Sequence, residues 1–255
     1  SPIRTQTTMI YIRSTIFFIL HAVTAVLFSC LGVLLWPLPF KWRYAVVSQW
    51  AKSNIWLLDK ICHVKLDVEG RQHIGDEPAV IICKHQSSWE TLALQAVFPP
   101  QVWVLKRELF WIPFFGWGLA SLNPIAIDRK AGRKALNQVI EQGLDRLTSG
   151  AWVVIFPEGT RIAKGYIGRF GIGGARLAKE TGYPVIPVCH DAGKSWPKHG
   201  FLKYPGVIKM TIGQKIATDS LSAAELNQQL FEWMEIQQTK LEGKKPMLLD
   251  KKKEQ

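Results

Sequence analysis

Residues 79–90 read AVIICKHQSSWE, which joins an uninterrupted apolar run to a polar turn and the start of a helical pattern. The run Ala79–Cys83 is typical of a buried strand, and Trp89–Val97 has the spacing of a helix. A strand, a turn and a helix in this order are the repeating unit of α/β proteins, whose ligands bind where strands end and helices begin. These twelve residues therefore predict both a fold class and the place of a functional site.

The same alternation continues along the chain. Further strands are predicted at Val64–Val68, Val102–Leu105, Ile125–Ile127, Trp152–Phe156, Val185–Cys189 and Val207–Ile212, and further helices at Arg133–Leu147, Gly173–Thr181 and Ala223–Leu241. Such alternation indicates an α/β fold with a mixed, largely parallel sheet flanked by helices. We expect three parts: N-terminal membrane-associating helices over 1–62, an α/β domain over 63–243, and a basic, flexible tail over 244–255.

The turn after Ala79–Cys83 carries a histidine and a carboxylate, His85 and Glu90. Five residues of regular helix would leave these side chains about 140° apart, so they can meet only if His85 lies in the loop. Ser87 and Glu90 have the spacing of a capping box, which places the helix start at Ser87 or Ser88 and also offers Glu90 a purely structural role. If the pair is functional, Glu90 fixes one ring nitrogen of His85 and the other takes a proton from a hydroxyl group. The rival interpretation is a serine nucleophile at Ser87 or Ser88, although no G-x-S-x-G elbow is present.

A second polar turn, FPEGTR at 156–161, follows another apolar run. Gly159 lets the backbone approach a ligand closely, and Arg161 can hold a phosphate through two parallel hydrogen bonds. The alternative is an ordinary turn that contains an ion pair between Glu158 and Arg161.

Two other cations, Lys106 and Arg129, also come directly or closely after strand-like runs. Three strand ends that bear cations and a fourth that bears His85 form one constellation at the edge of the predicted sheet. This convergence favours an enzyme that acts on a hydroxyl group of a phosphorylated substrate.

The N-terminal segment has no charged residue between Arg13 and Lys41. As a helix it would be about 35–40 Å long, enough to reach across a bilayer core of about 30 Å. The next segment, Trp42–Ile61, has helical apolar spacing and the cations Arg43, Lys52 and Lys60, which we expect to face phosphate headgroups. Two topologies remain open: the first helix spans the membrane, or the two helices form a hairpin within one leaflet. A buried helix pair in a soluble protein is the third possibility.

The aromatic stretch FWIPFFGW at 110–117 lies between two of the cationic strand ends. Core packing is its expected role. A groove for an acyl chain or a membrane-facing lip is the alternative.

The composition favours anionic partners, because 32 Lys and Arg against 20 Asp and Glu give a formal net charge of +12. Eleven tryptophans beside this charge point to a membrane, and no recognition-helix or metal-finger spacing points to nucleic acid. The four cysteines form no C-x-x-C pair and the histidines lack ligand spacing, so neither a disulfide framework nor a metal site is expected.

Four ordered blocks give the chain a specific resemblance: His85 to Glu90, Lys106 through Arg129, FPEGTR at 156–161, and Val185–Val188. The chain resembles the membrane-bound glycerolipid acyltransferase family, and within it the bacterial 1-acyl-sn-glycerol-3-phosphate (lysophosphatidic acid) acyltransferases. Two positions depart from the family pattern. Glu90 stands in place of the usual Asp, and Gly171 stands where members often carry a lysine.

The resemblance implies that His85 is the general base and Glu90 its acidic partner. It implies that Lys106, Arg129, Glu158, Gly159 and Arg161 shape the phosphate site of the acceptor. The implied reaction moves an acyl group from acyl-CoA or acyl carrier protein to the sn-2 hydroxyl of 1-acylglycerol-3-phosphate, without a metal or organic cofactor.

The expected partners are lysophosphatidic acid, the acyl donor and membrane phospholipids, with no nucleic acid. The expected place is a bacterial inner membrane, with the active site facing the cytoplasm. Glycerol 3-phosphate or another lysolipid as acceptor is an alternative, as is a serine hydrolase or thioesterase.

Overall fold

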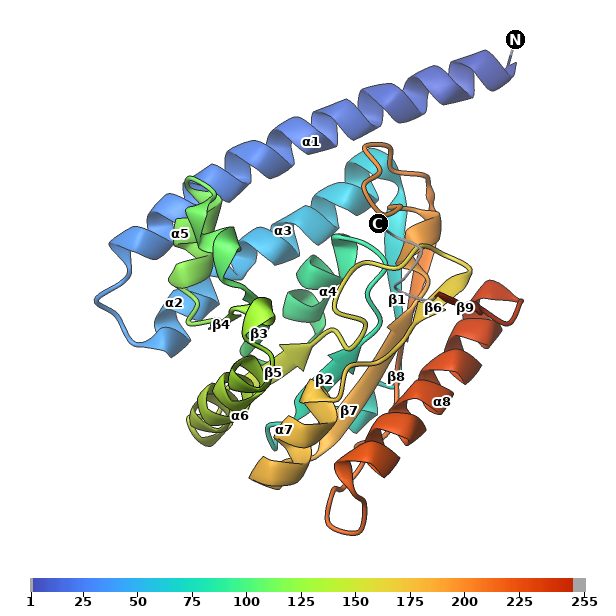
Figure 1. The fold of residues 1–255 in the computed structure, drawn as a ribbon. Coiled ribbons are helices and arrows are strands. Elements are labelled where there is room, and N and C mark those ends of the chain that lie inside the picture. The colour runs from blue at the N-terminus through green and yellow to red at the C-terminus, as the bar shows by residue number, and fades with distance from the viewer. Residues whose placement is uncertain (1, 250–255) are drawn as a thin grey trace.

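The computed structural model describes residues 2–249, apart from the side chains of residues 2, 3 and 129; residues 1 and 250–255 lie outside the described part. Within the described residues, seven strands form one sheet in the order β1-β8-β7-β2-β5-β3-β4 (Figure 1). All neighbouring strands run parallel except β7 and β8. The predicted mixed, largely parallel sheet is therefore confirmed. The strands are β1 (Val64–Glu69), β2 (Val80–Cys83), β3 (Gln101–Lys106), β4 (Ile125–Ile127), β5 (Trp152–Ile155), β7 (Val185–His190) and β8 (Gly206–Ile212).

Helices cover both faces of this sheet (Figure 1). In β2, Ile81 and Cys83 belong to one core cluster, and Val80 and Ile82 belong to the other. The uninterrupted apolar run in the sequence thus reflects a strand that is buried on both faces. The first face is covered by α2 (Phe40–Val47), α3 (Gln49–Leu57) and α4 (Trp89–Val97), and the second by α6 (Arg133–Thr148), α7 (Gly173–Thr181) and α8 (Ala223–Glu242).

Helix α1 (Pro2–Leu34) lies along the outside of the first helical layer (Figure 1). By length and composition its segment Arg4–Leu34 could cross a membrane. The side of α1 that faces the protein is narrow and partly polar, with Ser14, Phe17 and Ser29 buried. Its other side exposes a continuous set of large apolar side chains: Ile16, Phe18, Ile19, Val23, Val26, Leu27 and Leu34.

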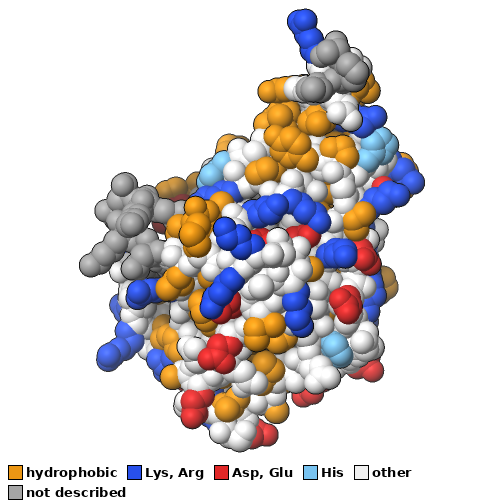
Figure 2. Space-filling view, turned by 90° about the vertical axis from the view of Figure 1, so that its right-hand side faces the viewer, with side chains coloured by type: hydrophobic (Ala, Val, Ile, Leu, Met, Phe, Trp, Pro, Cys, Tyr) orange, Lys and Arg blue, Asp and Glu red, His pale blue; other side chains and the backbone are white. Residues whose placement is uncertain are grey.

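Exposed apolar area of this extent is typical of a membrane contact. Figure 2 shows hydrophobic side chains gathered where the N-terminal part of α1 projects from the molecule, with Lys and Arg side chains below them. This arrangement suits a helix in lipid beside cations at the level of the headgroups. The structure therefore supports the predicted membrane association.

Helices α2 and α3 are part of the main core. Val47, Ala51 and Leu58 are buried in the same cluster as strand residues of the sheet, and Leu58 begins a π-helical turn, Leu58–Cys62, that leads into β1. The domain boundary expected at 62/63 thus does not separate two cores.

The environment of Arg43 differs from the one expected from the sequence. This residue does not face lipid headgroups but is buried, and its guanidinium donates hydrogen bonds to the carbonyls of Leu38 and Ser121 and to Oδ1 of Asn123. A buried guanidinium needs several acceptors, and the turns around it supply them. Lys52 and Lys60 remain exposed.

The aromatic stretch 110–117 does not pack into the core, so that expectation is wrong. It forms the end of a 3₁₀ turn, Arg107–Trp111, and the start of a short helix, α5 (Phe115–Ala120). Trp111 is 77 % exposed and Trp117 49 % exposed, as expected of a membrane-facing lip.

Two short strands were not predicted. β6 (Tyr166–Gly168) pairs in parallel with β9 (Met247–Leu249). The flexible tail expected over 244–255 is therefore wrong for these three residues, whose apolar side chains belong to a strand; residues 250–255 lie outside the described part.

Candidate active site

His85 lies in the loop between β2 and α4, as the spacing argument required. Its Nδ1 lies 2.7 Å from Oε1 of Glu90. The same oxygen accepts the backbone N–H groups of Gln86 and Ser87, at 2.8 and 3.0 Å. The helix-start role and the histidine-orienting role of Glu90 are thus combined in one carboxylate oxygen.

Glu90 has no exposed surface. Burial alone would raise the pKa of its carboxyl group, but His190, His85 and the N–H of Ser87 together hold that pKa below its ordinary value. Glu90 is therefore ionised at neutral pH, and its carboxylate can hold Nδ1 of His85 through a hydrogen bond.

His190, at the end of β7, lies behind Glu90. Its Nε2 is 2.8 Å from the carbonyl of Lys84 and 3.6 Å from Oε2 of Glu90, while its Nδ1 accepts the N–H of Ala192. These contacts assign the hydrogen to Nε2 and leave the ring neutral. Burial lowers the pKa of His190, which agrees with a neutral ring.

The His85 ring stacks on Phe156, with ring centroids 4.2 Å apart and planes 19° apart. Its side chain is 17 % exposed and lines a cavity of about 370 Å³. Because Nδ1 is held by Glu90, Nε2 is the nitrogen through which His85 can exchange a proton with a substrate.

The cavity is mostly apolar away from His85. It lies between α1, α3, β3 and α5, and its walls include Phe28, Trp50, Trp103, Leu105 and Leu119. A pocket of this shape and lining suits a hydrocarbon chain whose reacting end lies at the histidine.

Three of the predicted phosphate-site residues line the same cavity: Lys106, Gly159 and Arg161. Arg161 donates from Nη1 to the hydroxyl of Ser88 at 2.9 Å, which holds its guanidinium beside the His85 loop. Gly159 has a φ of +73°, a conformation that favours glycine. Arg129 begins a 3₁₀ turn after β4, and its side chain lies outside the described part.

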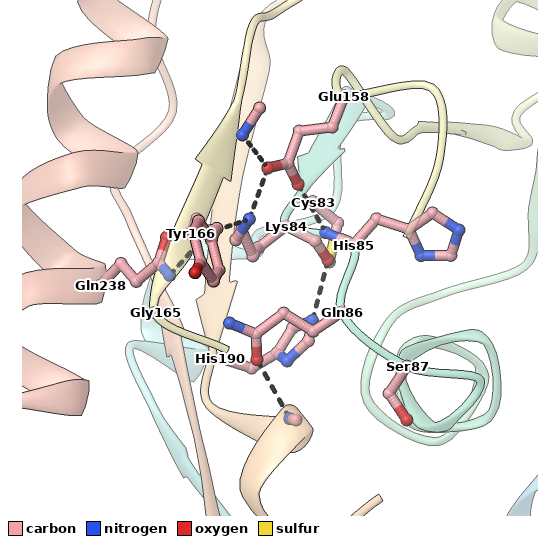
Figure 3. A network of polar contacts seen from close by, with 12 residues as sticks. Cys83, Lys84, His85, Gln86, Ser87, Glu158, Gly165, Tyr166, His190 and Gln238 are labelled. Atoms are coloured by element: carbon pink, nitrogen blue, oxygen red, sulfur yellow. Dashed lines mark hydrogen bonds and ion pairs between the residues drawn. The ribbon is translucent and has the colours of Figure 1, made fainter. Parts of the chain in front are cut away.

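Glu158 was also predicted to shape the phosphate site, but it does not line the cavity. Its side chain has no exposed surface. It turns into the protein, where it contacts Lys84, the N–H of His85 and the N–H of Gly168 (Figure 3).

The serine-nucleophile interpretation has no geometric support. Ser87 is buried, its hydroxyl accepts the N–H of Trp89, and it points away from the His85 ring (Figure 3). The hydroxyl oxygen of Ser88 accepts a hydrogen bond from Arg161. In the described residues, no group of three or more His, Cys, Asp and Glu side chains could hold a metal ion.

Sequence reasoning missed Lys84 and His190. Each is a polar residue at the end of an otherwise apolar strand, and β2 and β7 are neighbours in the sheet. A polar residue at the end of an apolar strand was a signal for a site residue. Using it requires knowing that β2 and β7 are neighbours, and the sequence does not reveal the strand order.

The fold and this site define an α/β acyltransferase domain with a histidine–carboxylate pair at the mouth of an apolar cavity. The sequence profile of the acyltransferase family matches residues 65–191. A 1-acyl-sn-glycerol-3-phosphate acyltransferase of Pseudomonas aeruginosa is 45 % identical over 228 residues, which cover 88 % of this chain and 89 % of that protein. The chain therefore belongs to the acyltransferase family, as the resemblance implied.

Two further comparisons agree with this assignment. A chloroplastic 1-acyl-sn-glycerol-3-phosphate acyltransferase of Brassica napus is 27 % identical over 58 % of this chain and 42 % of its own length. The crystal structure of the 1-acyl-sn-glycerophosphate acyltransferase from Thermotoga maritima matches with a TM-score of 0.77 over 91 % of this chain and 95 % of that one. At 23 % sequence identity, this last match shows the shared fold.

Proposed function

We propose that this protein transfers a fatty acyl group to the sn-2 hydroxyl of 1-acylglycerol-3-phosphate and so makes phosphatidic acid. The observation that carries the proposal is the 2.7 Å contact of His85 with Glu90 at the mouth of an apolar cavity that Arg161 also lines. The names of the relatives support the choice of acceptor.

The chemistry follows from the free nitrogen of His85. Nε2 takes the proton of the acceptor hydroxyl while the oxygen attacks the carbonyl carbon of a thioester. The tetrahedral adduct then collapses, the C–S bond breaks, and the imidazolium gives the proton that came from the acceptor hydroxyl to the leaving thiolate. The ionised Glu90 stabilises that imidazolium between the two steps.

Substrate binding divides between the two ends of the site. Arg161 and Lys106 hold the phosphate of the acceptor through charge-assisted hydrogen bonds. The apolar cavity takes the acyl chain. The donor is acyl-CoA or acyl carrier protein, both of which present a thioester and negative charge to a basic protein.

The exposed side of α1 and the aromatic lip at Trp111 and Trp117 bring this site to the surface of a bilayer, where the lysolipid resides. We place the protein in a bacterial inner membrane with the site facing the cytoplasm. The basic surface favours an anionic leaflet, and the cysteines of the described part are free.

An acyl-transfer assay on detergent-solubilised protein tests the proposal. Labelled acyl-CoA and acyl carrier protein are offered with 1-acylglycerol-3-phosphate, glycerol 3-phosphate or monoacylglycerol. Phosphatidic acid is the expected product, and His85→Ala should lower its rate by about 10²–10⁴ or more. Transfer only to glycerol 3-phosphate, or equally well to the phosphate-free lipid, would contradict the assigned acceptor. A trapped acyl-enzyme that is lost in Ser87→Ala or Ser88→Ala would support a serine hydrolase instead.

A further inference from the structure

The position of Glu158 in the FPEGTR turn predicts that its side chain lines the cavity. Gly159, Thr160 and Arg161 all line that cavity, whereas Glu158 is fully buried on the opposite side of the turn. We propose that Glu158 and Lys84 are a buried ion pair of positioning residues that hold the main chain of His85, and that neither contacts the acceptor.

Both oxygens of Glu158 already have protein partners. Oε1 accepts from the ammonium of Lys84 and from the N–H of Gly168 at 2.8 Å. Oε2 accepts the N–H of His85 at 3.1 Å (Figure 3). A buried carboxylate whose oxygens are both engaged is not available to a substrate, and a phosphate would repel it.

Lys84 explains why a carboxylate is needed there. It is the residue directly after β2, its side chain has no exposed surface, and its ammonium also donates to the carbonyl of Tyr166 at 3.3 Å. A buried ammonium with two carbonyl or carboxylate partners is stable only while its charge is balanced. Removal of Glu158 alone therefore leaves an uncompensated charge one residue before His85.

The pair acts on a different part of His85 from Glu90. Glu90 fixes the ring through Nδ1, and Glu158 fixes the backbone of the same residue through its N–H. The loop is also fastened by the N–H of Ile162, which donates to the carbonyl of His85 at 2.8 Å and joins the two turns. A shift of about 1 Å in Nε2 would be enough to reduce turnover strongly.

The inference rests on the proposed function, and it separates catalysis from acceptor binding. Glu158→Gln and Lys84→Met should each lower kcat by about 10–100-fold and leave the KM for 1-acylglycerol-3-phosphate within about threefold. The double variant Lys84→Met/Glu158→Gln should recover at least tenfold over either single variant, because it buries no unpaired charge. Arg161→Ala serves as the comparison for a residue that contacts the phosphate. The matched control is Glu180→Gln, which breaks an exposed ion pair with Arg176 on α7 and should behave as wild type.

A rise in acceptor KM in Glu158→Gln equal to that in Arg161→Ala, or losses that multiply in the double variant, would overturn the inference. Hydrogen exchange over the peptide 84–90 gives a readout that is independent of turnover. Protection of the His85 amide should be lost in Glu158→Gln and retained in Glu180→Gln; retained protection in Glu158→Gln contradicts the proposal. If the single variants do not fold, the double variant decides: turnover within about tenfold of wild type supports the pair, and a raised acceptor KM refutes it. A wild-type protein that forms no phosphatidic acid would instead refute the proposed function.

Discussion

Gly118 of α5 and Ser29 of α1 approach so closely that a Cβ on Gly118 would lie 2.4 Å from Oγ and 3.0 Å from Cα of Ser29. One turn further along, a Cβ on Gly32 would lie 2.4 Å from Oγ of Ser121. Small residues thus face each other across the two helices at successive turns, which lets the backbones come together. Since Ser29 and Gly118 both line the apolar cavity, this contact closes the cavity on the side of α1.

Gly118→Ala should therefore destabilise the protein, although alanine is the better helix former. A methyl group at this contact forces α1 away from α5, and we expect a cost of about 1–3 kcal/mol in the free energy of unfolding. Thermal unfolding in detergent measures it. Adding Ser29→Ala, which removes the nearest atom, should recover part of the loss. The matched control is Gly173→Ala at the start of α7, where the nearest atom would lie 3.8 Å away and helix propensity should make the change neutral or favourable.

His190 should make the protein sensitive to mild acid. Burial lowers its pKa below the ordinary 6.5, so the unfolded chain takes up a proton near pH 6.5 that the folded chain resists. The unfolded state then binds more protons, and stability is lost as the pH falls below about 6.5. Denaturant unfolding at pH 7.5, 6.5 and 5.5 should show a smaller loss in His190→Gln than in wild type. His199→Asn, at an exposed position with a φ of +56° that asparagine tolerates, should follow wild type. Equal slopes in all three proteins would contradict the role of His190.

The sequence predicted the sheet well because β2 and β5 are compact apolar runs, and β1 and β8 alternate apolar with polar residues. Ile125–Ile127, at only three residues, was still recognisable. β6 and β9 were missed because, within the described residues, each pairs only with the other, about 80 positions away in the chain, so no local pattern marks them. The aromatic lip was misjudged for a different reason: Trp111 is a large apolar residue and was assigned to the core, yet it is exposed, as expected of a residue at a bilayer interface.

The site was predictable where its contacts are local. His85 and Glu90 are five residues apart, so placing the helix start after His85 was enough to relate them. Glu158 and Lys84 are 74 residues apart, and a lysine is rarely buried unless it is paired. Their partnership depends on β2 and β5 being neighbours in the sheet, which becomes visible only in the folded chain.

The exposed side of α1 should control membrane binding. Ile19, Val23 and Leu27 recur every four residues and are all more than half exposed. Each side chain should contribute about 1.5 kcal/mol in lipid, so replacing all three by serine should weaken vesicle binding by about 10-fold per residue. Flotation with vesicles that contain anionic lipid measures this. Leu144→Ser, at an exposed apolar position on α6, is the control that should bind as wild type. Unchanged flotation of the triple variant would show that this side of α1 does not contact the membrane.

Arg161 should act on acceptor binding rather than on the chemical step. Its guanidinium lines the cavity and is oriented by Ser88, so we expect it to contact the phosphate equally in the ground state and in the transition state. Arg161→Ala should raise the KM for 1-acylglycerol-3-phosphate by about 10–100-fold, the value of a hydrogen-bonded charge contact, with little change in kcat. Arg161→Lys should recover part of the affinity but not the two-pronged contact. Steady-state kinetics over a range of acceptor concentrations decide the point, with Arg176→Ala on α7 as the control for loss of an exposed cation. A lower kcat at unchanged KM would instead make Arg161 a group that stabilises the transition state only, and would move the phosphate site toward Lys106.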